Sequence, residues 1–162
     1  MPSKTFAALI LGLLMATSAF AHEWATAVSK NAAEDRAVIF RYVSKLEPGF
    51  DRSKQPVRVI IIWNFKSESG MPSPDEKARM DELEDALEPS IENTGIATLA
   101  IVSTGENSCE WIYYASSSET FMSNLNQSIG MLPAFPIEIQ DSLDPTWSTY
   151  EELLSNVTTG HG

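Results

Sequence analysis

The stretch Val57–Phe65 (VRVIIIWNF) constrains the fold of this chain more than any other segment. Five of its first six residues are Val or Ile, Trp and Phe follow, and Pro56 precedes it. Such a β-branched and aromatic run predicts a strand that is covered on both faces. Because a strand without a polar face is unsuited to a solvated sheet edge, we expect it in the centre of a sheet.

The segments around this strand predict an α+β domain. Glu23–Lys30 and Ala37–Leu46 alternate loosely and predict a β-hairpin that precedes it. After Val57–Phe65 the pattern predicts a helix capped by Ser73 with Glu76 three residues later, and then a strand at Ile96–Val102 paired next to Val57–Phe65. A hairpin turn at 104–107 leads into a strand at Cys109–Ala115, and a second helix starts in Ser116–Ser118. The last elements are a strand at Ala134–Gln140, with Phe135, Ile137 and Ile139 on one face, and a short helix that is capped by Asp144 with Pro145 in its first turn.

From Val57 onward the expected order is strand, helix, strand, strand, helix, strand. This order is the ferredoxin-like plan, an antiparallel sheet with both helices on one face. The N-terminal hairpin either extends this sheet or covers its other face, and a short C-terminal helix follows. We therefore expect one α+β domain at 22–155 and a flexible tail at 156–162.

The first 21 residues have the features of a cleavable signal peptide. Lys4 supplies a positive start, Phe6–Met15 is nearly all apolar, and Ala19-Phe20-Ala21 matches an A-x-A cleavage site. The apolar segment is shorter than the roughly 20 residues that span a bilayer. We expect cleavage after Ala21, a periplasmic or secreted mature chain that starts at His22, and no membrane insertion after cleavage.

The chain is acidic, with 22 Asp and Glu against 11 Lys and Arg and a formal net charge of −11. Such a surface repels phosphate backbones and anionic lipid, so nucleic-acid binding and membrane-surface binding are disfavoured. Solubility is one explanation of the excess acid, and a basic partner is the other. The sequence does not identify that partner as a protein or a small molecule.

Residue types on which common catalytic sites depend are scarce. The chain has two histidines, His22 and His161, and one cysteine, Cys109, which we expect to be a buried strand residue rather than a reactive thiol. It has no G-x-S-x-G motif, no zinc-ligand spacing and no glycine-rich phosphate loop, so we expect no cofactor and no metal. Two alternatives stay open: copper binding by an N-terminal His22, and acid–base chemistry by carboxylates in a pocket, with Glu151/Glu152 or Asp141/Asp144 as candidate pairs.

Four aromatic side chains are the candidate binding residues: Trp111, Tyr113, Trp147 and Tyr150. Trp111 and Tyr113 share one face of their expected strand with Cys109. An exposed aromatic face is suited to a peptide, a glycan or a protein partner, and core packing beneath the helices is the alternative. Trp147 and Tyr150 likewise either wall a ligand groove or pack against the sheet.

Several of these features together resemble a known family. They are the opening Glu23-Trp24 and Arg41-Tyr42 strands, the run Val57–Trp63, the Gly70-Met71-Pro72 loop, the Gly105 turn before Trp111-Ile112-Tyr113-Tyr114, and the ending Asp144-Pro145-Thr146-Trp147-Ser148-Thr149-Tyr150. From Glu23 to about Leu154 the chain resembles the bacterial family of domain of unknown function 695. The resemblance implies an α+β domain and supplies no activity and no catalytic residues. Members sometimes accompany domains similar to bacterial regulators of ribonuclease E, which implies regulatory binding, although the predicted leader departs from that cytoplasmic setting.

These observations predict an exported, acidic, single-domain α+β protein that acts as a non-catalytic binding or regulatory module. The missing nucleophile, metal and phosphate motifs and the aromatic-rich strand support this hypothesis. A hydrolase-type enzyme with carboxylates in a pocket and a copper-binding protein are the alternatives.

Overall fold

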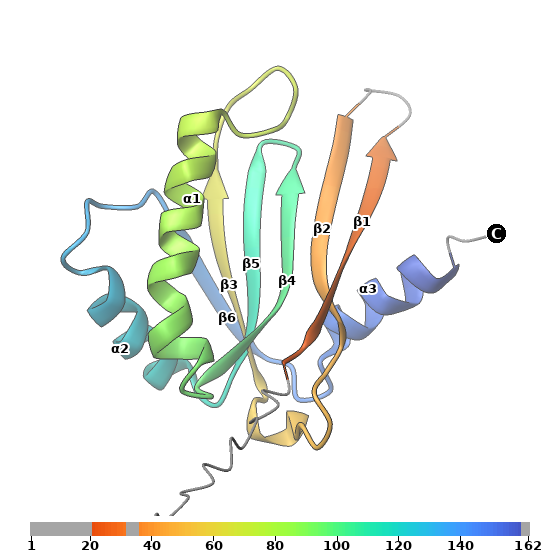
Figure 1. Cartoon of the computed structure of the whole chain (residues 1–162), viewed down its shortest axis with the longest axis vertical. Coiled ribbons are helices and arrows are strands. Elements are labelled where there is room, and N and C mark those ends of the chain that lie inside the picture. Colours follow the sequence, from red (N-terminus) through yellow and green to blue (C-terminus); the bar gives the residue numbers. More distant parts are fainter. Residues whose placement is uncertain (1–20, 32–35, 160–162) are drawn as a thin grey trace, which may run out of the picture.

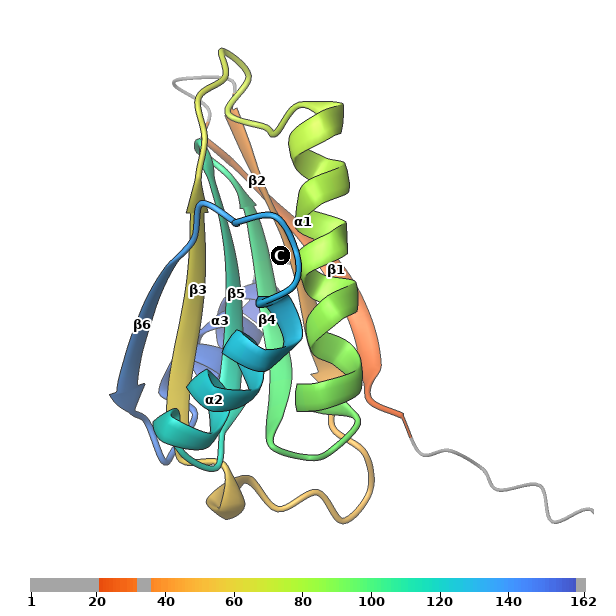
Figure 2. The same cartoon turned by 90° about the vertical axis from the view of Figure 1, so that its left-hand side faces the viewer.

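The computed structural model describes residues 21–31 and 36–159 (Figure 1). In this part of the chain, six strands form one antiparallel sheet in the order β1-β2-β4-β5-β3-β6. The strands are β1 (Glu23–Asn31), β2 (Arg36–Lys45), β3 (Val57–Asn64), β4 (Ala97–Gly105), β5 (Ser108–Ala115) and β6 (Glu138–Leu143). Helices α1 (Pro74–Leu87) and α2 (Ser118–Ile129) lie on one face of the sheet, and α3 (Ser148–Thr159) lies on the other (Figure 2). The protein is therefore α+β.

The N-terminal hairpin extends the sheet. Strands β1 and β2 pair antiparallel, and β2 also pairs with β4, with Phe40 opposite Ser103. The expected hairpin is thus confirmed, and of its two possible positions the structure has the one beside the other strands.

Strand β3 lies inside the sheet, but second from its edge rather than at the centre. It is paired on both sides, by β5 and β6. The prediction that Ile96–Val102 pairs next to β3 was wrong, because β5 lies between β3 and β4. Helix α1 connects β3 to β4, and these strands run in the same direction, so an antiparallel sheet needs an oppositely directed strand between them.

Helix α1 begins as the sequence predicts. The Ser73 hydroxyl accepts a hydrogen bond from the Glu76 backbone N–H at 3.3 Å, and the Ser73 N–H donates to the Glu76 carboxylate at 2.8 Å. This capping box satisfies two backbone donors at the helix start. A π-helical turn, η2 (Glu88–Glu92), follows α1, and the chain turns away at Gly95, which has a φ of +75°.

After β5, the start of α2 agrees with the sequence and the start of β6 does not. Ser117, within the predicted Ser116–Ser118 segment, caps α2, because its hydroxyl accepts the Thr120 N–H at 3.1 Å. Strand β6 begins at Glu138 and not at Ala134. Pro136 has no backbone N–H for a ladder and restricts the residue before it, so 134–137 form a loop instead.

Helix α3 begins at Ser148, later than expected, and Pro145 is not in its first turn. Asp144 caps it from four residues upstream, because its carboxylate accepts the N–H groups of Ser148 and Thr149. Trp147 has a φ of +56°, which turns the chain into the helix. The helix runs to Thr159, beyond the boundary expected at 155. Residues 1–20 of the predicted leader, which runs to Ala21, and His161 lie outside the described residues.

Each face of the sheet carries its own apolar core. Cys109, Trp111 and Tyr113 pack beneath α1 and α2, whereas Ile112 and Tyr114 pack beneath α3. This alternation confirms the strand prediction for 109–115 and explains why β5 is buried on both faces.

Candidate functional site

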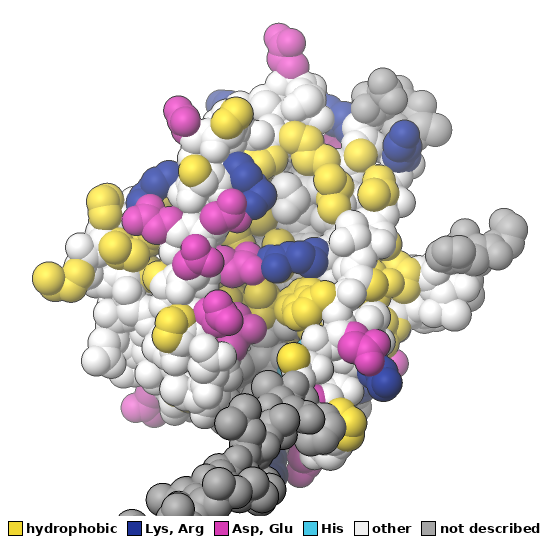
Figure 3. Space-filling view, in the orientation of Figure 1, with side chains coloured by type: hydrophobic (Ala, Val, Ile, Leu, Met, Phe, Trp, Pro, Cys, Tyr) yellow, Lys and Arg dark blue, Asp and Glu magenta, His cyan; other side chains and the backbone are white. Residues whose placement is uncertain are grey.

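A cleft of about 740 Å³ opens between α1 and the β1–β2 hairpin (Figure 3). We call it the main cleft. Helices α1 and α2 lie over the other half of the sheet, so β1 and β2 have no helix over this face (Figure 1). Side chains of the strands form its floor, α1 forms one wall, and the loop that carries Met71 closes one end. The lining includes Arg41, Met71, Lys77, Met80, Asp81, Glu84, Asp85, Val102, Cys109 and Trp111.

The hairpin contributes exposed apolar side chains on the same side as the cleft. Trp24, Val28 and Ile39 keep 40%, 57% and 39% of their surface exposed. Val28 and Ile39 are direct cross-strand partners, and Ile39 lines the cleft. Because large apolar side chains gathered on one surface are uncommon in monomeric proteins, this row marks a candidate contact surface.

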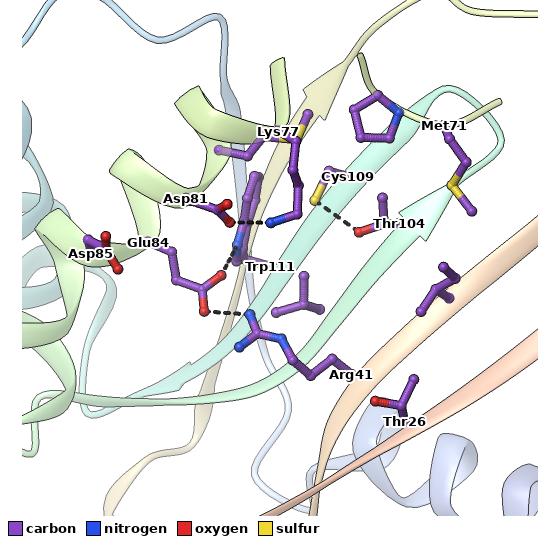
Figure 4. A pocket seen from close by; sticks show the side chains of 14 residues that line it. Thr26, Arg41, Met71, Lys77, Asp81, Glu84, Asp85, Thr104, Cys109 and Trp111 are labelled. Atoms are coloured by element: carbon purple, nitrogen blue, oxygen red, sulfur yellow. Dashed lines mark hydrogen bonds and ion pairs between the residues drawn. The ribbon is translucent and has the colours of Figure 1, made fainter. Parts of the chain in front are cut away.

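A chain of polar contacts crosses the main cleft from the hairpin to α1 (Figure 4). The Arg41 guanidinium forms an ion pair with Glu84 and lies 5.1 Å from the centroid of the Trp24 ring. The Trp111 indole N–H donates to the other Glu84 oxygen at 3.0 Å. These contacts fix the position of the Glu84 carboxylate and tie the uncovered hairpin to the helix.

The remaining charges on the α1 wall are mainly acidic. Lys77 and Asp81 form an ion pair one helical turn apart. Asp85 lines the cleft and has no ion-pair partner among the described residues. The wall therefore presents one unpaired carboxylate beside an apolar floor.

Cys109 lies at the closed end of the main cleft as a buried thiol. It is 3% exposed, and its Sγ lies 3.4 Å from the Thr104 hydroxyl. Burial raises the pKa of the Cys109 thiol to about 11. Because the thiolate is the nucleophilic form, Cys109 is a packed side chain at neutral pH rather than a reactive one.

The structure does not bring the four predicted aromatic residues together. Trp111 and Tyr113 are buried beneath α1 and α2, and Trp147 and Tyr150 are buried beneath α3 on the other face. Of the four, Trp111 alone lines the main cleft. A ligand role for the other three stays a prediction, and each has clear packing contacts.

The Asp-Pro-x-Trp-x-x-Tyr ending anchors α3. The Trp147 ring stacks on Tyr114 with ring centroids 4.1 Å apart, and its indole N–H donates to the Gln55 carbonyl at 2.9 Å. The Tyr150 hydroxyl donates to the Val43 carbonyl at 2.7 Å. The Tyr114 hydroxyl donates to Asp144 at 2.8 Å. The motif thus binds its helix to three other parts of the chain.

A second cavity, of about 460 Å³, lies between the start of β1, the loop after β2 and η2. We call it the lower pocket. Its lining includes Trp24, Glu47, Phe50, Gln55 and Glu92. Burial raises the pKa of Glu92 to about 7, and the negative charges of Glu84 and Glu88 add to this effect.

Glu92 is not among the candidate residues that the sequence predicts. A signal was present, because Glu84, Glu88 and Glu92 recur at four-residue spacing and such residues share one helix face. The pattern did not reveal that this line ends in a pocket, because the pocket is closed by segments far away in the sequence.

His22 also lines the lower pocket. Its Nδ1 accepts the Glu47 backbone N–H at 3.0 Å, and its ring packs edge-on against Phe50. Burial lowers the pKa of His22, although Glu47 opposes this shift. Copper chelation through Nδ1 would require the bond to Glu47 to break. Within residues 21–31 and 36–159, no three His, Cys, Asp or Glu side chains gather closely enough to hold a metal ion.

The carboxylate pairs named from the sequence lie elsewhere. Glu151 forms an ion pair with Arg52, and Asp144 caps α3. Neither Glu151/Glu152 nor Asp141/Asp144 lines the main cleft or the lower pocket.

The fold and the two cavities define an acidic α+β domain with an open cleft on the half-covered face of its sheet. The chain belongs to the family of unknown function DUF695, whose model matches residues 22–155. The match confirms the resemblance drawn from the sequence. No curated protein sequence matches the chain. In the described ranges no helix has the length and apolar character needed to cross a membrane.

Proposed function

We propose that this protein is an exported, non-catalytic binding module that takes an extended segment of a partner protein in the main cleft. The partner segment carries apolar side chains and at least one basic side chain. The observation that carries this proposal is the uncovered half of the sheet, where an apolar floor lies beside the acidic wall of α1.

Two features support this partner chemistry. The exposed row Trp24, Val28 and Ile39 continues the apolar floor outward, which suits apolar side chains of an extended chain. The unpaired Asp85 and the net charge of −11 favour a basic segment, because complementary charge steers and orients association.

A peptide titration tests this proposal. Three capped heptapeptides alternate Leu with Lys, with Glu or with Ser, and NMR follows the Trp111 indole signal and the Ile39 methyl signals. We expect the Lys peptide to bind roughly tenfold more tightly than the Ser peptide, and the Glu peptide to bind least. Equal binding of the Lys and Glu peptides would contradict a cleft selective for basic segments.

A pair of variants localises the binding. Ile39→Glu places a charge on the cleft floor and is expected to weaken binding of the Lys/Leu peptide, because the apolar contact is lost. Leu143→Glu places the same charge on β6, at a side chain that is 79% exposed and outside the cleft, and should leave binding unchanged. Equal effects of the two variants would place the peptide elsewhere.

We also propose that the sheet has a ferredoxin-like core and that the protein is exported. The strand order β6-β3-β5-β4 and the placement of α1 and α2 on one face support a ferredoxin-like core. The apolar segment and the Ala19-Phe20-Ala21 site support export with cleavage after Ala21. Mass spectrometry of the released protein tests the cleavage, because a first residue other than His22 would contradict it.

A carboxylate-dependent hydrolase is the second candidate function. Glu47 and Glu92 line the same pocket, and a carboxyl with a pKa near 7 is suited to general acid–base catalysis. A screen of hydrolase substrates on the purified protein tests this candidate. Turnover that disappears in Glu92→Gln would replace the binding module with an enzyme.

Copper binding stays an alternative that depends on His22 as the first residue. An isothermal titration of the cleaved protein with Cu²⁺, compared with a chain that retains Ala21, tests it directly. Equal weak binding by both forms would remove the alternative.

A further inference from the structure

The contact between Trp24 and Arg41 joins the lower pocket to the main cleft. Trp24 lines the lower pocket, and Arg41, which lies over the Trp24 ring, lines the main cleft. The indole thus links the lower pocket to a residue of the main cleft. A ligand of the lower pocket would therefore shift the NMR signal of the Trp24 indole, whereas a ligand of the main cleft would shift that of Trp111.

The charge at the lower pocket is negative and uncompensated. Glu92 is partly buried and has no ion-pair partner among the described residues. Glu84 and Glu88 on the same helical line add to the negative potential at its carboxylate. Arg41 opposes this potential, but its guanidinium is already ion-paired with Glu84. A partly buried carboxylate in this setting is stabilised by any cation that enters the pocket.

Gln55 supplies an independent observation at the lower pocket, a buried polar side chain with an unpaired atom. Its side chain is more than nine-tenths buried and lines the lower pocket. Its Nε2 donates to the Gly95 carbonyl at 3.2 Å, while its Oε1 is buried and has no hydrogen-bond partner among the described residues. Because buried polar atoms in folded proteins are nearly always paired, this oxygen is an unmet acceptor in the wall of the lower pocket.

We propose that the lower pocket binds an alkylammonium group, with Glu92 as its counter-ion and the Gln55 Oε1 as a hydrogen-bond acceptor. An ammonium group offers three donors and a single compact charge, which matches one carboxylate and one amide oxygen. The rings of Trp24 and Phe50 also line the pocket and provide an apolar and cation-attracting surface for the alkyl stem.

Two sources of this group share the same chemistry. One is the lysine side chain of a partner protein, and the other is a free aliphatic amine. The volume of about 460 Å³ exceeds what an ammonium group alone needs, so the pocket also accommodates the stem of either ligand. The pocket is argued from its own residues and does not depend on the peptide proposed for the main cleft.

An NMR titration with three probes tests the proposal. The probes are cadaverine, Nα-acetyl-lysine methylamide and the uncharged Nα-acetyl-norleucine methylamide, and the signal followed is the Trp24 indole N–H. We expect saturable shifts with ammonium probes and roughly tenfold weaker binding of the norleucine derivative. Binding of both ammonium probes indicates that the pocket recognises the group itself. Binding of the lysine derivative alone identifies a protein side chain, and binding of cadaverine alone identifies a free amine.

Two matched variants make the test specific. Glu92→Gln removes the counter-ion and is expected to weaken binding of the ammonium probes by roughly tenfold. Glu152→Gln makes the same charge change on the exposed surface of α3, outside the pocket, and should leave affinity within about twofold. Equal effects of the two variants, equal binding of the norleucine probe, or no saturable shift at Trp24 would each overturn the proposal. Circular dichroism of both variants confirms that they fold.

Discussion

At the scale of single residues, the structure separates neighbours that look alike in the sequence. Tyr113 and Tyr114 are adjacent and fully buried, but they face opposite cores. The Tyr114 hydroxyl donates to Asp144, whereas the Tyr113 hydroxyl has no hydrogen-bond partner in the part of the chain that the structure describes. The period-2 pattern predicted the two faces correctly. It did not reveal the hydrogen bond, because Asp144 is thirty residues away.

This difference predicts opposite outcomes for one substitution at adjacent positions. Tyr114→Phe removes a buried hydrogen bond to a carboxylate and should lower the free energy of unfolding by roughly 2 kcal/mol. Tyr113→Phe removes a buried hydroxyl that has no partner, so it should be neutral or stabilising. Urea denaturation of both variants measures these values. Equal losses in the two variants would contradict the described hydrogen bonds.

Glu92 makes a second residue-level prediction, which concerns pH. Its pKa rises from 4.5 to about 7 on folding, because burial and the charges of Glu84 and Glu88 disfavour the carboxylate. A raised pKa means that the folded state holds a proton that the unfolded state releases first. The contribution of protonated Glu92 to the stability of the folded state is therefore complete below pH 4.5, and it is lost as the pH rises through about 7.

Glu92→Gln should accordingly be more stable than the natural protein at pH 8, by on the order of 1 kcal/mol after allowance for solvent around the side chain. At pH 4 the two proteins should be equally stable. Urea denaturation at both values measures the difference, with Glu152→Gln as a control for the loss of one surface charge. A stability difference that is the same at pH 4 and pH 8 would contradict the shift.

At the scale of elements, local signals were sufficient where a local contact decides the outcome. The capping box at Ser73 and Glu76 predicted the start of α1 because both of its hydrogen bonds lie within four residues. The start of α3 was predicted less well, because Asp144 caps it from a distance and Trp147 adopts a left-handed conformation. The neighbours of β3 were mispredicted because pairing depends on the direction of strands joined by a distant hairpin.

Gly105 lies against a strand that is distant in the sequence, and this contact yields a prediction. The sequence identified it as a hairpin turn residue, but a Cβ added there would lie 2.3 Å from the Ala37 carbonyl oxygen on β2. Gly105→Ala should therefore separate β2 from β4 and lower the free energy of unfolding by roughly 2–4 kcal/mol. Thermal denaturation gives the loss, and hydrogen exchange should show faster exchange in β2.

Gly95→Ala is the matched control for this substitution. Gly95 also has a positive φ, +75°, but an added Cβ meets nothing within 4 Å. It should cost about 1 kcal/mol through backbone conformation alone. A loss at Gly95 as large as the one at Gly105 would mean that conformation, rather than the contact with β2, determines both effects.

At the scale of the whole molecule, the chain covers one face of its sheet only in part. The sequence predicted α+β layers and amphipathic helices, and these follow from local periodicity. It did not predict the main cleft, because the cleft results from a mismatch between six strands and the width of two helices on that face (Figure 1). Glu84 is one of several acidic residues of α1, and its bonds to Arg41 and Trp111 depend on the assembled sheet.

The acidic surface predicts that salt affects folding and binding in opposite directions. With a net charge of −11, the folded chain repels itself, and salt screens this repulsion, so the melting temperature should rise by a few degrees between about 0.05 and 0.5 M NaCl. The same screening weakens attraction between the cleft and a basic peptide, so affinity for the Lys/Leu peptide should fall several-fold over that range. Differential scanning fluorimetry and calorimetric titration measure the two quantities on one sample.

The Ser/Leu peptide provides the reference, because its affinity has no charge term to lose. If its affinity fell as steeply as that of the Lys peptide, salt would be acting on the fold of the cleft rather than on charge complementarity.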